Sequence, residues 1–182
     1  MLPLVTSLVP TRSTRWPTRN RLLLTVGALV LTVLAAWPSA QALRRAPVAP
    51  DGQLYDLQHD EALGGHTLAR HVGRTDQELA ERLRREPNIS AASTYSDVNT
   101  ARRTVALALA QSRDRIDSWA SRRGSRPNLV LNYVQRDGTP VGRSLFRGER
   151  TSRPCERALV VLRWLERERQ WIVLTSYPET RR

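Results

Sequence analysis

Two histidines lie close together in the sequence and could transfer protons. They are His66 and His71, and both fall in the stretch GGHTLARHVGRTDQELAERL, residues 64–83. An imidazole titrates near neutral pH, which suits it to donate or accept a proton. Arg82, near the end of this stretch, carries a guanidinium whose forked donors match a phosphate. A histidine and an arginine that converge on a phosphate would suit phosphoryl chemistry, although spacing alone does not show that they converge.

A short helix would position these groups. Thr75 is a suitable N-cap, and Glu78 follows three residues later, as a capping box requires. Leu79 and the leucine four residues after it share one face of such a helix. Pro87 ends the helix, because the residue before a proline is disfavoured in helical conformation. The pattern therefore predicts a helix over residues 75–86.

Further helices are expected before Gly124. The leucines in residues 54–63 predict a short helix that the following glycine pair ends. Residues 88–99 are rich in small hydroxyl side chains and indicate a loop or a short strand. A longer helix is predicted from about Asp97 to Ser121, because apolar residues recur there at helical spacing.

The pattern changes near Pro127, where runs of β-branched and aromatic residues begin. Asp137-Gly138 predicts a hairpin turn between the first two of these runs. The charged residues 166–170 predict a turn between the last two. Helices followed by antiparallel strands predict an α+β fold with a twisted antiparallel sheet. The expected strands are residues 129–134, 141–146, 158–165 and 171–177.

The N-terminal residues have the pattern of a secretory signal. Arginines precede a charge-free apolar run, residues 22–37, which is short for a membrane span and suitable for a signal sequence. Ala40-Gln41-Ala42 then fits a small-x-small cleavage site. We therefore expect residues 1–42 to be a signal peptide, with an uncleaved membrane anchor as the alternative. Residues 43–54 would be a linker and residues 55–182 the folded domain.

The composition favours polyanionic partners. The net charge is +12, and every one of the 29 basic residues is an arginine. GC-rich coding also produces such a composition, but arginine still offers donors that match phosphate. A single cysteine, Cys155, excludes an internal disulfide framework. No metal site or cofactor is expected, because His59-Asp60-Glu61 would fan around a helix axis. No pattern of a DNA-binding motif occurs.

Several short motifs follow one another in a specific order. They are GGHTLARHVGRT at 64–75, Leu79-x-x-Arg82-Leu83, AASTY at 91–95, Trp119, and LTSYP at 174–178. With these motifs the chain resembles the bacterial RNase A-like toxin domain found at the C-termini of contact-dependent growth-inhibition proteins. The resemblance covers most of residues 55–178. It implies an RNase A-like fold without disulfides and metal-independent cleavage of RNA.

The resemblance also implies a catalytic set. The histidine, arginine, threonine and tyrosine of the family fall on His71, Arg82, Thr175 and Tyr177. Such cleavage uses the 2′-hydroxyl of the RNA as nucleophile, and it needs a base, an acid and positive charge at the phosphorus. Arg82 can bind the pentacoordinate phosphate. The second proton could belong to Tyr177 or to His66, or one histidine could act in both steps.

Structural roles for these residues stay open on spacing alone. His71 could be a buried histidine that binds a backbone carbonyl, and Arg82 a solvated helix residue. Thr175 and Tyr177 are two apart, so on a strand they share a face. Trp171 has the same parity and could bind a base in the cleft, but a place in the core is favoured for it. His66 could bind substrate or simply begin a helix.

We therefore expect an exported endoribonuclease that acts as an antibacterial toxin. RNA would be its substrate, and a cognate immunity protein its possible partner. We expect a secreted or periplasmic monomer without a stable membrane partner once the signal is removed. The alternative is a catalytically inactive binding module of the same fold, located in the envelope.

Overall fold

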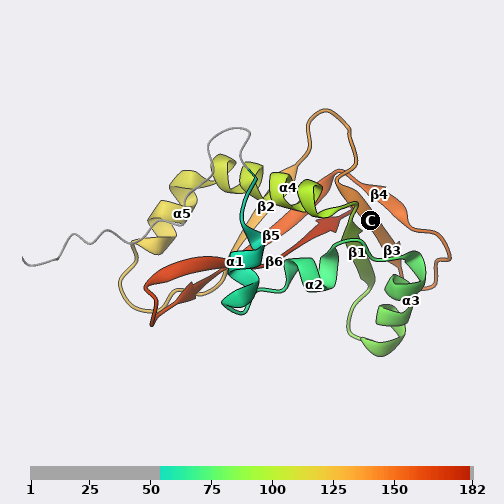
Figure 1. The fold of residues 1–182 in the computed structure, drawn as a ribbon, viewed down its shortest axis with the longest axis horizontal. Helices are drawn as coiled ribbons and strands as arrows, with labels where there is room; N and C mark the ends of the chain where they lie inside the picture. Colours follow the sequence, from blue (N-terminus) through green and yellow to red (C-terminus); the bar gives the residue numbers. More distant parts are fainter. Residues whose placement is uncertain (1–53, 181–182) are drawn as a thin grey trace, which may run out of the picture. The chain divides into compact units, whose positions relative to one another are not determined.

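The structure of the protein, a computed structural model, describes residues 54–180 (Figure 1). The predicted signal peptide and nearly all of the predicted linker lie outside these residues. The helices are α1 (Leu57–Ala62), α2 (Thr67–His71), α3 (Asp76–Arg85), α4 (Val98–Gln111) and α5 (Arg113–Ala120). The strands are β1 (Ala91–Tyr95), β2 (Leu129–Val134), β3 (Gly142–Phe146), β4 (Arg153–Cys155), β5 (Arg157–Leu165) and β6 (Gln170–Glu179).

The strands form two antiparallel sheets of three strands, with the orders β1-β3-β4 and β2-β5-β6. The predicted α+β fold is confirmed, and Cys155 is a free buried thiol. Strands β5 and β6 form a long hairpin through the charged turn that the sequence predicts. Within this hairpin β6 also approaches β1 of the other sheet, where the Tyr95 hydroxyl and Ser176 Oγ are 2.5 Å apart. Strand β6 thus connects the two sheets.

Two hydrophobic clusters hold these layers together. The main core lies between α4, α5 and one face of the β2-β5-β6 sheet, and Leu109, Ile116, Leu131 and Val160 are each at most 2% exposed. The second cluster fixes α3 to β1 and β3. Its buried members are Leu79, Leu83, Ala92 and Leu145. Helix α3 is therefore anchored to the β1-β3-β4 sheet through the leucine face that the sequence predicts.

The predicted hairpin between residues 129–134 and 141–146 is wrong. Both segments are strands, but β2 pairs with β5 and β3 pairs with β1 and β4. The chain still turns here, at Arg136-Asp137, and Gly138 follows with φ 74°. Local turn residues set the bend, whereas burial of side chains decides which strands pair. Strand β1 also precedes Gly124, so only part of the sheet structure follows the helices.

The predicted long helix over residues 97–121 is two helices. It begins as expected, because the Asp97 side chain caps α4 by accepting a hydrogen bond from the Thr100 N–H at 2.8 Å. It breaks at Ser112, whose N–H donates to the Leu109 carbonyl three residues back, at 3.2 Å. Serine is a weak helix former because its hydroxyl competes for backbone groups. Helix α5 then begins at the next residue.

Candidate active site

His71 is the last residue of α2, and its side chain is buried beside β1. Only 6% of the residue is exposed. Its Nδ1 lies 3.2 Å from the Ser93 carbonyl oxygen of β1. Its ring lies beside the Tyr177 ring of β6, with 5.2 Å between centroids and an interplanar angle of 31°. The expected helix start at His66 is confirmed, and helix α2, whose extent the sequence did not predict, carries His71 between β1 and β6.

The contact with Ser93 fixes the tautomer of His71. A carbonyl oxygen can only accept a hydrogen bond, so Nδ1 must carry the hydrogen. Arg82 Nη1 lies 3.5 Å from the same Nδ1, but a guanidinium can only donate, so this longer contact is not a hydrogen bond when Nδ1 carries the hydrogen. In the neutral ring the lone pair is then on Nε2, which is the atom able to accept a proton. The expected structural role, binding a backbone carbonyl, and the expected catalytic role are thus compatible.

Arg82 reaches this histidine from α3. The helix starts with the predicted capping box, in which the Thr75 N–H donates to Glu78 at 2.7 Å and the Glu78 N–H donates to Thr75 at 3.2 Å. One turn before the helix ends, Arg82 Nε lies 3.3 Å from both carboxylate oxygens of Glu86. Its side chain is 18% exposed. Glu86 therefore holds the guanidinium through Nε, and Nη1 is turned toward His71.

Thr175 and Tyr177 lie on the face of the β5–β6 hairpin that points away from the main core. They pair with Val161 and Leu159 of β5, both half-buried, whereas the alternate residue Val160 is fully buried in the core. Residues directly opposite each other share a face of a sheet. The expectation that Thr175 and Tyr177 share a face is therefore confirmed.

The expectation that Trp171 shares this face is wrong. Val161 and Leu162 of β5 are consecutive, yet their partners Thr175 and Val173 are two residues apart. One residue of β6 is therefore left without a partner, and this bulge reverses the alternation of side chains. Trp171 lies in the main core, where it is 4% exposed. Such a bulge cannot be recognised from the alternation of residues in the sequence, because it depends on how the strand pairs with its neighbour.

A cleft of about 260 Å³ brings the remaining predicted residues together. Helices α2 and α3 and strands β1 and β6 contribute to it. Its lining includes all four residues of the expected catalytic set, together with His66. The lining residues are His66, Arg70, His71, Arg82, Ile89, Ala91, Ala92, Ser93, Thr175 and Tyr177.

The Thr175 hydroxyl is chemically unsatisfied in this cleft. Its Oγ1 is buried and has no hydrogen-bond partner among the described residues. A buried hydroxyl without a partner costs on the order of 1–3 kcal/mol. A polar ligand in the cleft would remove this cost, so Thr175 is suited to bind one.

His66 lies at the start of α2 and forms no side-chain cap there. Its backbone N–H donates to the Leu174 carbonyl of β6 at 2.9 Å. The residue before it must be glycine, because a Cβ on Gly65 would lie 2.7 Å from the Val173 carbonyl oxygen and 3.0 Å from that of Asp60. This close approach places α2 directly against β6 and brings His66 to the rim of the cleft.

The environment sets the charge state of each group. Burial, and next the positive charge of Arg82, lower the pKa of His71 to about 3. Burial and then the charge of Arg70 lower the pKa of His66. Burial and then the carboxylate of Glu179 raise the pKa of Tyr177. At neutral pH the cleft therefore holds two neutral imidazoles that can accept a proton and a phenol that keeps its own.

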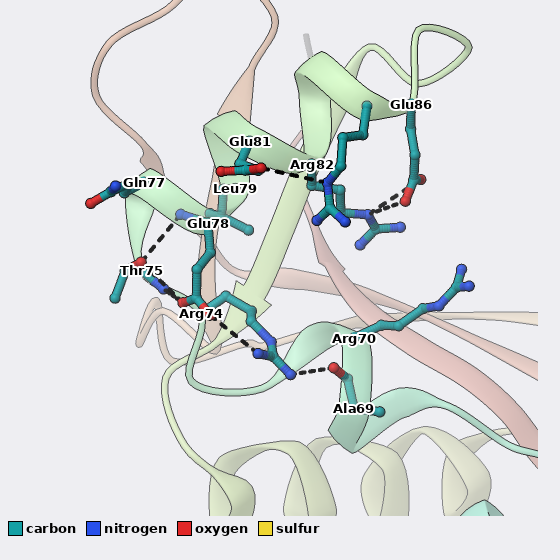
Figure 2. A pocket seen from close by; sticks show the side chains of 11 residues that line it. Ala69, Arg70, Arg74, Thr75, Gln77, Glu78, Leu79, Glu81, Arg82 and Glu86 are labelled. Carbon is teal, nitrogen blue, oxygen red and sulfur yellow. Dashed lines mark hydrogen bonds and ion pairs between the residues drawn. The ribbon is translucent and has the colours of Figure 1, made fainter.

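A second pocket, of about 480 Å³, adjoins the cleft between α2 and α3 (Figure 2). Arg70 and Arg82 line both, and Figure 2 shows the Arg70 side chain extended on the same side of the pocket as Glu86. Arg74 pairs with Glu78 at 3.2 Å, but Arg70 forms no ion pair with any described residue. Sequence reasoning missed Arg70, although it directly precedes His71 in the motif.

Two features of the described residues concern metals and membranes. Within residues 54–180, no group of three or more histidine, cysteine, aspartate or glutamate side chains could hold a metal ion. No helix of the same residues has the length and apolar character that crossing a bilayer requires.

Comparisons with known proteins agree on one family. Residues 65–178 match the family described as the bacterial CdiA-CT RNAse A domain. A similar solved structure is that of a CdiA-CT/CdiI complex from Y. kristensenii 33638. The two chains are 29% identical with a TM-score of 0.56, over 64% of this chain and 100% of the other. A search of curated proteins gives no match.

The matched residues span from the glycine before His66 to the proline after Tyr177. They therefore include every residue that the cleft brings together. The fold, the motif order and the family match agree, and the chain belongs to the family of bacterial CdiA-CT RNase A domains.

Proposed function

We propose that this protein is a metal-independent endoribonuclease that cleaves RNA by attack of its 2′-hydroxyl on the adjacent phosphorus. Membership in a ribonuclease toxin family supports the general activity. The observation that carries the specific proposal is that four residues from two distant parts of the sequence line one cleft. They are His71 and Arg82 from one part, and Thr175 and Tyr177 from the other.

His71 acts as the general base. Its Nε2 accepts the proton of the 2′-hydroxyl while O2′ attacks the phosphorus. The Ser93 carbonyl keeps the hydrogen of the neutral ring on Nδ1 and stabilises the imidazolium that forms. Burial and Arg82 oppose that charge in the protein alone, and a bound phosphate offsets the effect of Arg82.

Arg82 stabilises the pentacoordinate phosphorane. Glu86 occupies its Nε, so the Nη donors remain for the phosphate oxygens. A guanidinium can donate two parallel hydrogen bonds to such an anion. Thr175 adds its buried hydroxyl, which lacks a hydrogen-bond partner among the described residues. Hydrogen-bond donors held in place by the protein thus stabilise the negative charge that develops on the phosphorane oxygens.

Tyr177 is the proposed acid for the leaving 5′-oxygen. Its raised pKa keeps the phenol protonated at neutral pH, and its ring lies beside His71. The phosphorus–O5′ bond breaks as the phenol proton passes to O5′, and the products are a 2′,3′-cyclic phosphate and a free 5′-hydroxyl. The phenolate then recovers its proton by way of water or the His71 imidazolium. His66 is the other candidate for this proton.

The biological role we propose is that of an exported antibacterial toxin with a cognate immunity protein. The solved relative is a toxin domain bound to its CdiI partner, and that observation supports such a partner here. The N-terminal arginines and apolar run support export, with a membrane anchor as the alternative. N-terminal sequencing of protein recovered outside the cytoplasm should begin at Leu43, and retention of residues 1–42 in membranes would contradict cleavage.

The direct test compares the two histidines of the cleft. We expect His71→Ala to lower the rate of RNA cleavage by roughly 10²–10⁴, the usual contribution of a general acid–base group. His66→Ala is the matched control, and it should retain activity if Tyr177 is the acid. Circular dichroism must show that both variants fold. Normal cleavage by a folded His71→Ala protein would contradict the assignment, and a folded parent protein that binds RNA without cutting it would support the inactive module.

A further inference from the structure

A third pocket, of about 540 Å³, adjoins the candidate active site, and Arg70 does not line it. Ile89, Ala91, Ser93 and Tyr177 line both the cleft and this pocket. The pocket has about twice the volume of the cleft. The remaining lining residues are Asn88, Ser90, Ser144, Phe146, Arg157, Pro178, Glu179 and Thr180.

Two charged side chains of this pocket lack partners among residues 54–180. Arg157 and Glu179 pair directly across β5 and β6, so they lie on the same face. Their side chains nevertheless form no hydrogen bond or ion pair with each other or with any other described residue. The Nε of Arg157 is buried without an acceptor. A buried donor without an acceptor is costly, and its cost falls when a ligand supplies the acceptor.

The pocket continues the catalytic face of the hairpin. Thr175, Tyr177 and Glu179 are two residues apart along β6, so their side chains follow one another at about 7 Å along one face. Tyr177 stands between the phosphate-binding end of the cleft and the pair Arg157 and Glu179. A nucleotide whose phosphate lies against Arg82 would therefore have its own base, or that of its neighbour, within reach of the pocket.

We propose that this pocket binds the base of a nucleotide next to the scissile phosphate and selects guanine. The inference rests on the proposed ribonuclease function. Guanine presents two adjacent acceptors, O6 and N7, that match a guanidinium. It also presents donors at N1 and N2 that match a carboxylate. Arg157 and Glu179 supply this donor and this acceptor, and the base stacks beside Tyr177.

The other bases match this pair less well. Adenine has a donor at N6 beside N7, so it presents only one acceptor to the guanidinium there. Uracil has a single ring donor, and cytosine has a single amino group for the carboxylate. The volume of the pocket, about 540 Å³, also accommodates a purine. Guanine thus satisfies both charged side chains at once.

The test uses DNA oligonucleotides with one internal ribonucleotide, so that only one phosphate can be cut. The bases on its two sides are varied over all combinations, and kcat/KM is measured with the purified protein. We expect guanine at one fixed side to exceed adenine by about ten- to a hundredfold, the scale of one bidentate base contact. Arg157→Ala should abolish most of this preference. Arg163→Ala, another arginine of β5 that does not line the pocket, is the matched control and should retain it.

Atomic changes in the substrate test each assigned contact separately, in the parent protein and in the matching variant. Replacing the selected guanine by 7-deazaguanine removes N7, and this should slow the parent protein but not Arg157→Ala. Replacing it by inosine removes the N2 amino group, and this should slow the parent protein but not Glu179→Gln. Equal effects on parent and variant would overturn the assigned contacts.

The outcomes separate this inference from the proposed function. Cleavage of all contexts at similar rates would overturn the guanine pocket and leave the ribonuclease intact, as would a preference for another base. If no oligonucleotide is cut, the ribonuclease proposal fails. In that case NMR titrations compare the affinities of guanosine monophosphate and adenosine monophosphate, and they test the pocket directly. Tighter binding of the guanosine nucleotide, lost in Arg157→Ala, would support the guanine pocket. Equal binding of the two nucleotides, or no binding, would overturn it.

Discussion

The burial of His71 should determine how catalysis responds to pH. Its pKa is lowered to about 3 in the free protein by burial and by Arg82. Because kcat/KM reports the ionisation of free enzyme, its acid limb should lie well below the ordinary histidine value of about 6.5. In the complex a bound phosphate offsets Arg82, so the acid limb of kcat should lie at higher pH. A kcat/KM limb near pH 6.5 in folded protein would contradict this account.

Arg82 acts on both the phosphate and the histidine, and its substitution should separate the two effects. Arg82→Ala should lower the cleavage rate by roughly 10²–10³, the scale of one transition-state donor. Arg82→Lys should recover only part, because a point charge cannot replace two planar donors. Since Arg82 lowers the pKa of His71, the acid limb of kcat/KM should move to higher pH in Arg82→Ala. An unchanged limb would mean that burial alone sets this pKa.

The candidate site was predictable only where a motif marks it. His71, Arg82, Thr175 and Tyr177 were identified from the order of short motifs, and the structure brings all four to one cleft. Their catalytic roles stay predictions. The Ser93 carbonyl that fixes the tautomer could not be predicted, because any residue type supplies a carbonyl. The charged pair of the third pocket was missed for another reason, since its two members meet only through the register of β5 and β6.

At the scale of elements, a buried carboxylate fixes α1 to β6. Asp60 is 3% exposed and accepts hydrogen bonds from the Val173 N–H at 2.7 Å and the Tyr55 hydroxyl at 2.9 Å. Burial raises its pKa to about 6. The folded protein therefore binds this proton more tightly than the unfolded chain does. Between about pH 4 and pH 6, the contribution of Asp60 to the free energy of unfolding falls as pH rises.

Asp60→Asn should remove this dependence. Both donors reach the same carboxylate oxygen, which the amide oxygen of asparagine can replace. The free energy of unfolding of the variant, relative to that of the parent, should increase by up to about 3 kcal/mol between pH 4 and pH 7. This is the equivalent of a pKa shift of about two. His71 has the opposite effect on the pH dependence. Because folding lowers its pKa, its contribution to the free energy of unfolding increases as pH rises toward about 6.5. Urea denaturation of both proteins at the two pH values measures this increase. If the free energies of unfolding of variant and parent differ by the same amount at both pH values, the prediction is contradicted.

Local signals predicted the elements, and long-range packing decided their partners. The capping box of α3 and the hairpin of β5 and β6 depend on neighbouring residues, and both are confirmed. The pairing of β2 with β5 and the bulge in β6 depend on burial across the sheet, and both contradicted the sequence pattern. The bulge turns Trp171 into the core, the place favoured for it, and away from the face that its parity with Thr175 indicated. Residues an even number of positions apart lie on the same face of a sheet only where no bulge interrupts the strand between them.

For the whole molecule, the surface charge suits the proposed substrate. The chain carries a net charge of +12, all of its basic residues are arginines, and Arg70 stands unpaired among described residues at the junction of two pockets. Such a field attracts a polyanion and makes its binding sensitive to salt. Affinity for RNA alone would therefore not distinguish a ribonuclease from the inactive binding module.

The most direct measurement is incubation of the purified protein with RNA in EDTA, followed by analysis of the new ends. The account predicts cleavage that leaves 2′,3′-cyclic phosphates and 5′-hydroxyls, because O2′ is the nucleophile and the residues of the cleft transfer the protons. RNA with 2′-O-methyl groups should resist, since its nucleophile is blocked. Activity that EDTA abolishes and a divalent ion restores, or equal cutting of the methylated RNA, would contradict the account.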